Sequence, residues 1–330
     1  MSSIMISIIC NTYNHEKYIE QTLKGFVNQK TTYPYEILIH DDASTDRTAE
    51  IIRRYADAYP SLFKPIYQTE NQYSQGINVS GAYQYSRAKG KYIAFCEGDD
   101  YWCDPEKLQK QVDFLERHPA YSACVHQTQV IDDDGEKKGL FSPIDKTCDI
   151  EELNEYMDFP HTSSFLLRNP FIDDTRRGKY LQKYISYWDK SMVIYMFRTG
   201  KIHYLADIMS CYRCVTDKGT SFQARMKSKN MTKEIVDAEL CHYRQLRAYR
   251  MDVDIANHYF RNVNLYALKK WLHYPSVGNF KLMVYGIRKC PFPKRKMIRF
   301  FWNKLKICTV NITGMVINKL WKTKAKAEKE

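Results

Sequence analysis

The 330-residue sequence contains no apolar run of the roughly 18–20 residues that a membrane-spanning helix requires. Its first ten residues lack the basic segment of a signal peptide, and their apolar stretch is too short for one, so we expect a cytoplasmic protein. Glycine (13) and proline (11) are scarce, which excludes a fibrous or low-complexity chain. With 44% hydrophobic and 27% charged residues, the composition is instead that of a folded globular protein.

Two phosphate-binding patterns are also missing. No Gly-x-Gly-x-x-Gly follows a predicted strand, which argues against a dinucleotide-dependent dehydrogenase. The loop at residues 11–14 has no glycine, which disfavours a sugar-phosphate nucleotidyltransferase, the alternative enzyme class with a similar order of strands and loops. Among ten scattered cysteines, Cys211 and Cys214 form a lone Cys-x-x-Cys in a strand-like run, so we expect reduced core residues and not a zinc site.

The positive charge is concentrated at one end of the chain. Residues 281–330 hold 14 Lys or Arg and two acids, a net +12 that equals the net charge of the whole chain. Apolar residues recur at helical spacing among these bases over residues 297–320, which predicts an amphipathic helix suited to an anionic membrane surface. Packing of this tail on the rest of the protein is the alternative. We expect no nucleic acid, because no recognition motif accompanies the basic residues.

Predicted strands and helices alternate along the first 130 residues. Alternation of this kind predicts an α/β fold built from βαβ units, with a mostly parallel sheet flanked by helices. We predict strands at residues 4–10, 35–40, 63–68, 91–96 and 121–130, and helices at 16–28, after 44–46, at 78–88 and at 104–118. Farther on we predict strands at 161–168, 202–205 and 208–215, and helices at 189–199 and within 231–275.

Polar and acidic residues follow three of the predicted strands. They are the loop at residues 11–15, the pair Asp41-Asp42 and the pair Asp99-Asp100. Ligands of open α/β sheets bind outside the carboxyl ends of the strands, so these residues are expected to share one site. Carboxylates together with phosphates are the usual ligands of Mg²⁺ and Mn²⁺, which predicts a metal–diphosphate site. We assign no role to His161, because a lone histidine is most often structural.

Three segments carry a family resemblance. They read ISIICNTYN (6–14), ILIHDDASTD (37–46) and KGKYIAFCEGDD (89–100). In order and spacing they resemble the nucleotide-sugar half of the family 2 glycosyltransferases, which are inverting enzymes with the GT-A fold. The resemblance implies that Asn11, Thr12, Tyr13 and Asp42 hold the nucleoside, that Asp99 lies on the sugar side, and that Asp100 binds Mn²⁺ or Mg²⁺.

The same resemblance implies roles in the second half of the chain. Asp189, within Trp188-Asp189-Lys190, is placed as the catalytic base that takes the proton of the acceptor hydroxyl in a single displacement. A helix cap is the alternative role for Asp189. Arg213 is implied to meet the diphosphate, as part of the nucleotide-sugar site.

The resemblance also implies a domain plan and a reaction. Residues 1–225 would form the GT-A catalytic domain, divided into a nucleotide-sugar half (1–130) and an acceptor half (131–225), and residues 226–330 a helical extension with the basic tail. The expected reaction moves a hexose or N-acetylhexosamine from a UDP-sugar to a glycan or polyprenyl-diphosphate-linked acceptor, in bacterial polysaccharide biosynthesis. The protein would then work peripherally on the inner face of the plasma membrane. A non-catalytic basic protein that binds anionic surfaces is the alternative from another class.

Overall fold

The computed structural model describes residues 4–151, 159–172, 188–214 and 276–289. The chain divides into two compact units; the first contains all the elements from β1 to β10, and helix α10 (Val277–Lys289) belongs to the second. The helices predicted within 231–275 and 297–320, and most of the basic tail, lie outside the described residues. The proposed domain boundary at 225/226 lies there too and stays a prediction.

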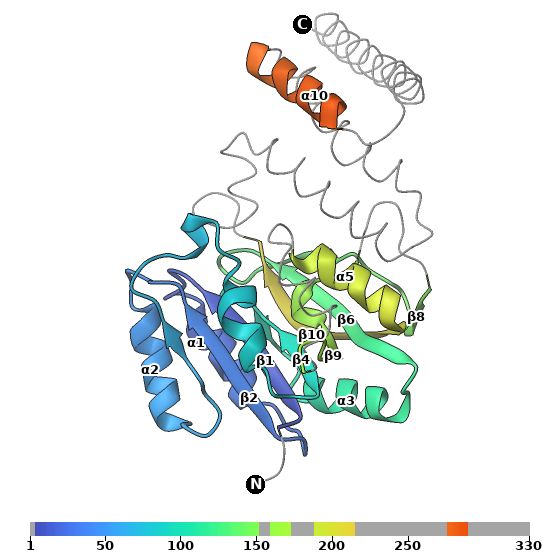
Figure 1. Cartoon of the computed structure of the whole chain (residues 1–330). Helices are drawn as coiled ribbons and strands as arrows, with labels where there is room; N and C mark the ends of the chain where they lie inside the picture. The colour runs from blue at the N-terminus through green and yellow to red at the C-terminus, as the bar shows by residue number, and fades with distance from the viewer. Residues whose placement is uncertain (1–3, 152–158, 173–187, 215–275, 290–330) are drawn as a thin grey trace, which may run out of the picture. The chain divides into compact units, whose positions relative to one another are not determined.

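The described part of the first unit is built on a ten-stranded sheet whose main path runs β3-β2-β1-β4-β9-β6-β10-β5 (Figure 1). In addition, β7 pairs with β6 and β8 pairs with β10. The strands are β1 (Ile6–Thr12), β2 (Tyr35–Asp41), β3 (Ile66–Tyr67), β4 (Tyr92–Phe95), β5 (Tyr101–Trp102), β6 (Tyr121–Ile131), β7 (Lys137–Phe141), β8 (Cys148–Ile150), β9 (Leu166–Arg168) and β10 (Lys201–Arg213). The α-helices in the described part of this unit are α1 (Ile19–Val27), α2 (Thr48–Ala58), α3 (Lys107–Arg117) and α5 (Trp188–Thr199).

The central strands are parallel, and their register explains the Ile-rich sequences. Ile8 of β1 lies opposite Ile37 of β2 and Ala94 of β4. Strands buried on both faces carry nearly continuous apolar runs, as these do. The long strands β6 and β10 are also parallel, whereas β9 joins β4 to β6 in antiparallel pairing. The predicted α/β fold is therefore confirmed.

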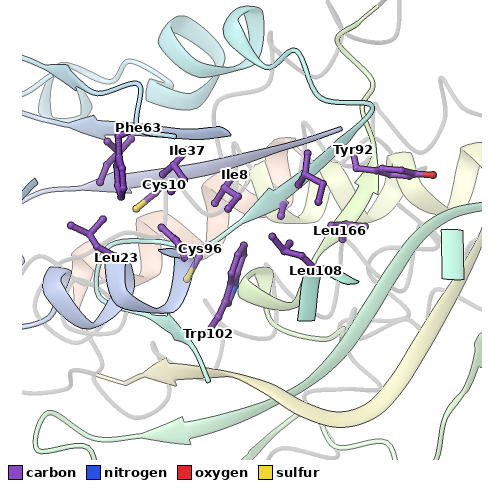
Figure 2. Packing of buried hydrophobic residues seen from close by; sticks show 14 of the residues in the cluster. Ile8, Cys10, Leu23, Ile37, Phe63, Tyr92, Cys96, Trp102, Leu108 and Leu166 are labelled. Atoms are coloured by element: carbon purple, nitrogen blue, oxygen red, sulfur yellow. The ribbon is translucent and has the colours of Figure 1, made fainter. Parts of the chain in front are cut away.

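Alternate residues of these strands pack into two apolar layers. On one face Ile8, Ile37 and Cys96 belong to a cluster with buried residues of α1, α2 and α3. Figure 2 shows these three residues beside Trp102 and Leu108. The other face packs against α5 and the turns that precede β4. The cysteines at positions 10, 96, 124 and 211 are buried free thiols, as expected for core residues. The expectation was wrong for Cys103, which is exposed, and only partly right for Cys148 and Cys214, which are partly exposed.

Several predicted elements differ in the structure. The strand predicted at 161–168 is a 3-10 turn (Thr162–Ser164) followed by the short strand β9. The helix predicted at 78–88 is a π-helical turn (Ser80–Gln84) followed by a 3-10 turn (Tyr85–Arg87), where the buried Gln84 side chain donates to the Leu38 carbonyl oxygen at 3.0 Å. The two strands predicted at 202–205 and 208–215 are the single strand β10, with irregular register between Leu205 and Ile208. This local bulge explains why the sequence pattern breaks there.

Candidate active site

The loops that follow β1, β2 and β4 lie side by side at one edge of the sheet. The Asp42 backbone N–H donates to the Thr12 carbonyl oxygen at 3.0 Å, and the Gly98 N–H donates to the Asn11 carbonyl oxygen at 2.9 Å. A Cβ atom at Gly98 would overlap the Thr12 side chain, so only glycine permits this approach. The structure thus brings together the three polar segments that the sequence analysis singled out.

The loop after β1 is held by polar contacts. Asn11 Nδ2 donates to Ser80 Oγ at 2.8 Å, and the buried Thr12 places Oγ1 3.1 Å from His15 Nδ1. His15 Nε2 lies 3.9 Å from Asp99 Oδ2, which joins this loop to the acidic one. Tyr13 is partly exposed at the same edge. His15 is not among the predicted site residues, and only its place at the end of this loop could have indicated a role in the site.

Asp42 is almost fully buried and organises the segment that follows β3. Its Oδ1 accepts the backbone N–H of Gln72 at 2.9 Å, and its Oδ2 accepts that of Tyr73 at 3.0 Å. The Tyr73 side chain is 59% exposed, so this carboxylate orders a short segment that presents an aromatic ring at the surface. The role of Asp42 toward a nucleoside stays a prediction.

Residues 97–100, here called the acid loop, bring three carboxyl groups together. Asp100 is 2% exposed, and its Oδ1 accepts the Arg213 backbone N–H at 2.9 Å. Burial, followed by the negative charge of Asp99, raises the pKa of Asp100 well above its ordinary value. The same two causes raise the pKa of Glu97 to about 8, against hydrogen bonds from Asn11.

Arg213, which is 5% exposed, joins the acid loop to two other elements. Its Nε donates to the Asp99 carbonyl oxygen at 3.2 Å, and its Nη2 donates to Gln21 Oε1 of α1 at 2.9 Å. Its Nη1 donates to the carbonyl oxygens of Asp132 and Asp133 in the turn after β6, at 3.1 and 3.2 Å. The guanidinium carbon also lies 4.5 Å from the centre of the Tyr18 ring. These contacts are structural, and the contact of Arg213 with a diphosphate that the resemblance implies stays a prediction.

We expect Arg213→Lys to lower the free energy of unfolding by about 3 kcal/mol, because an ammonium group keeps the charge but cannot make this set of divergent hydrogen bonds. Urea unfolding followed by circular dichroism measures the change. Arg47→Lys is the matched control, because the Arg47 side chain is 74% exposed. Wild-type stability in Arg213→Lys would show that only the positive charge matters.

His161 lies beside the acid loop, although the sequence analysis assigned it no role. Its Nδ1 is 3.7 Å from Asp100 Oδ2, and its ring stacks on Tyr212 with centroids 4.2 Å apart. Burial lowers the pKa of His161 to about 3, so the imidazole is neutral at pH 7 and the pair is not an ion pair. His161 precedes the 3-10 turn η4 (Thr162–Ser164), which leads into β9.

Asp189 lies in the first turn of α5 and is partly exposed. Helix α5 packs against β6 and β10 through buried residues such as Met192 and Met196. Asp189 therefore occupies the half of the chain that was predicted to bind the acceptor. Its role as a base stays a prediction.

The carboxylate oxygens of the acid loop suit a divalent cation whose remaining ligands are substrate phosphates and water. Three carboxyl groups lie within this four-residue loop, and burial followed by the negative charge of Asp99 raises the pKa of both Glu97 and Asp100. Within the described ranges, no group of three or more His, Cys, Asp or Glu side chains is arranged to hold a metal alone. Mg²⁺ commonly binds one or two carboxylates and completes its shell with substrate phosphates and water. The residues of the acid loop fit this arrangement, in which the protein supplies only one or two ligands.

Comparisons with known proteins agree with this geometry. The model of the family named Glycosyl transferase family 2 matches residues 7–175. The uncharacterized protein Rv1520 of Mycobacterium tuberculosis is 43% identical over 171 residues, which are 51% of this chain and 49% of that protein. The Escherichia coli UDP-Glc:alpha-D-GlcNAc-diphosphoundecaprenol beta-1,3-glucosyltransferase WfaP is 33% identical over 138 residues, 42% of this chain and 51% of that one. The chain thus matches about half the length of these curated relatives.

A crystal structure of S. aureus TarS (residues 1–349) in complex with UDP-GlcNAc has a TM-score of 0.60 to this chain at 17% identity. The match covers 86% of this chain and 79% of that one. At this identity the likeness concerns the fold alone, and it confirms the predicted GT-A fold. Together with the family model, which matches about half of the sequence, it leads to one conclusion: the chain belongs to glycosyl transferase family 2.

Proposed function

We propose that the protein is a glycosyltransferase that moves a hexose or N-acetylhexosamine from a UDP-sugar to a glycan or polyprenyl-diphosphate-linked acceptor, with inversion. The observation that carries the proposal is the convergence of the Asn11–Tyr13 loop, Asp42 and the acid loop at one edge of a GT-A sheet. The name of WfaP supports a UDP-sugar donor and a lipid-diphosphate acceptor, and TarS was crystallised with UDP-GlcNAc.

Each residue at this edge has a proposed part. The nucleoside and sugar would be bound by the residues that the family resemblance implies, namely Asn11, Thr12, Tyr13, Asp42 and Asp99. Arg213 would lie near the diphosphate. Asp100 would hold Mn²⁺ or Mg²⁺, which when bound would neutralise the diphosphate and make it a better leaving group.

The transfer itself would be a single displacement. The acceptor hydroxyl oxygen attacks the anomeric carbon from the face opposite the diphosphate, and the bond from that carbon to the diphosphate oxygen breaks with its electron pair. Asp189 takes the hydroxyl proton as the new bond forms. Attack from the opposite face inverts the configuration at the anomeric carbon.

A panel of nucleotide sugars tests the proposed reaction. With Mn²⁺ and a membrane-lipid extract as the source of acceptor, we expect UDP-sugars to release UDP at least about 10-fold faster than GDP- or dTDP-sugars release their nucleotides. Removal of the cation with EDTA should abolish the release, because the crowded acids then lack a neutralising charge. Equal, slow release from every donor would contradict the proposal.

We also propose that residues 281–330 dock the protein on an anionic membrane surface. The described part of the chain includes no helix long and apolar enough to cross a bilayer. Each Lys or Arg near an anionic surface adds about 1 kcal/mol before screening, so the basic excess of this segment suffices for reversible docking.

Flotation with vesicles tests the docking. We expect the full chain to float with vesicles that contain phosphatidylglycerol and not with phosphatidylcholine vesicles. Simultaneous substitution of Lys294, Arg295 and Lys296 by Glu should weaken flotation at least about 10-fold. Substitution of the same three residues by Gln controls for loss of charge without reversal, and equal flotation of all three proteins would remove the proposal.

A further inference from the structure

A chain of buried hydroxyl groups ends at the ring of His161. Thr128 Oγ1 of β6 lies 2.9 Å from Ser210 Oγ of β10, and Ser210 Oγ lies 2.9 Å from Ser163 Oγ of η4. Ser163 Oγ in turn lies 2.9 Å from His161 Nδ1. All three hydroxyl residues are completely or almost completely buried. Buried polar groups are costly unless they are paired, so this chain is a specific arrangement within the core.

The backbone determines the direction of these hydrogen bonds. The Ser163 backbone N–H donates to His161 Nδ1 at 3.3 Å, so Nδ1 is an acceptor and the ring proton is on Nε2. The Ser163 hydroxyl must then donate to Nδ1. Because each hydroxyl has one proton, Ser210 donates to Ser163 and Thr128 donates to Ser210. The whole chain is therefore polarised toward the imidazole.

The resulting Nε2–H belongs to a ring that is held at the acid loop. Nδ1 of this ring lies 3.7 Å from Asp100 Oδ2. The ring stacks on Tyr212 and forms a T-shaped pair with Phe141 at a centroid distance of 5.0 Å. The Trp102 indole N–H donates to the Ser163 carbonyl oxygen at 3.0 Å, which fastens η4 to β5, directly after the acid loop. Among the described residues none accepts a hydrogen bond from Nε2, and the side chain remains 13% exposed.

We propose that His161 binds the nucleotide sugar, donating its Nε2–H to a diphosphate oxygen or a sugar hydroxyl, and that the Thr128–Ser210–Ser163 chain helps the Ser163 backbone N–H to hold the ring in place. The proposal rests on the proposed function. Capping of η4 alone would use only Nδ1 and would need neither Ser210 nor Thr128. The hydroxyl chain instead gives Nδ1 a second donor, the Ser163 hydroxyl, and so helps to hold the imidazole ring in one position.

The test compares three variants of the full chain. His161→Phe keeps a ring to stack on Tyr212 but removes both nitrogens, and Ser210→Ala interrupts the hydroxyl chain. Ser122→Ala is the matched control, because Ser122 is also buried on β6, but its hydroxyl donates to the Met196 carbonyl oxygen outside the chain. Calorimetry measures the Kd of UDP and of UDP-glucose with Mn²⁺. The imidazole ¹⁵N spectrum without metal reports the tautomer.

We expect His161→Phe to weaken UDP-glucose binding about 10- to 100-fold. Ser210→Ala should weaken it about 3- to 10-fold, because the Ser163 hydroxyl loses a partner that holds it against Nδ1, while the Ser163 backbone N–H still keeps the ring proton on Nε2. Ser122→Ala should lose stability but keep the wild-type Kd and the single Nε2–H tautomer. If UDP and UDP-glucose are weakened equally, the accepting oxygen is on the diphosphate; if only UDP-glucose is weakened, it is on the sugar.

Two results would overturn the inference. One is wild-type affinity for both nucleotides in His161→Phe, and the other is an Nδ1–H tautomer in the wild-type spectrum. Failure of the proposed function looks different, because the wild-type protein would then bind neither nucleotide. That result would also remove the proposed ligand of His161. The imidazole spectrum would still show whether the ring proton is on Nε2.

Discussion

Asp189→Asn is expected to lower kcat for sugar transfer about 10³-fold while leaving the Kd for UDP and Mn²⁺ unchanged. Asparagine has the shape of aspartate and caps helices equally well, so the substitution separates a role as base from a role as helix cap. A carboxylate that takes the acceptor proton contributes only in the transition state, so the loss should appear in kcat and not in donor affinity. Steady-state kinetics and calorimetry on the same preparation measure both quantities.

Asp207→Asn is the matched control for this substitution. Asp207 lies on β10, its side chain is 55% exposed and it meets Lys110 at 3.6 Å, so its amide variant should behave as wild type. Wild-type turnover in Asp189→Asn with unchanged stability would show that the base lies elsewhere. Lower stability with full turnover would show that the negative charge of Asp189 stabilises the first turn of α5 and has no part in catalysis.

Asp100→Asn is expected to reduce metal-dependent turnover by about 10³-fold and, at pH 7.5 without metal, to raise the melting temperature. The pKa of Asp100 in the folded protein is raised well above its ordinary value by burial and by Asp99. When the pKa of a carboxyl group is higher in the folded protein than in the unfolded chain, its ionisation destabilises the folded protein at any pH above its pKa in the unfolded chain. Asparagine removes that cost while its amide oxygen still accepts the Arg213 N–H that Asp100 Oδ1 accepts at 2.9 Å.

Activity as a function of Mn²⁺ concentration and thermal unfolding measure the two effects together. Asp145→Asn is the control for the melting temperature, because Asp145 is exposed and its substitution removes a solvated charge. Full activity of Asp100→Asn without metal would refute the assignment of Asp100 to a cation. A lowered melting temperature would show that the buried charge is already compensated in the folded protein.

The parts of the fold that follow from local patterns could be predicted from the sequence. The strand predicted at 35–40 is β2 (Tyr35–Asp41), because a strand buried on both faces leaves a run of apolar residues. The edge of the sheet that carries the loops of Asp42 and Asp100 could also be predicted, since parallel strands bring their carboxyl ends together. The helix predicted at 78–88 was only partly right, because hydrogen bonding of the buried Gln84 side chain to the Leu38 carbonyl oxygen is a tertiary effect.

The contacts that join the site to distant parts of the chain could not be predicted. Arg213 donates to Gln21, which is 192 residues earlier in the sequence. The family resemblance pointed to Arg213, but no local pattern marks Gln21 as its partner. The hydrogen bond between Thr128 and Ser210 likewise depends on β6 lying beside β10. A single serine or threonine in a strand has no sequence signal for such a network. These contacts follow from strand order, which the sequence pattern leaves open.

The support of Asp100 by Arg213 also bears on how the protein is made. The two residues are 113 positions apart, so a ribosome synthesises the acid loop long before it synthesises the residue whose backbone N–H binds the Asp100 carboxylate. Until β10 is added to the sheet, the N-terminal half therefore lacks the N–H that Asp100 Oδ1 accepts. A fragment cut at residue 175, where the match to the family model ends, would lack β10 and therefore this hydrogen bond.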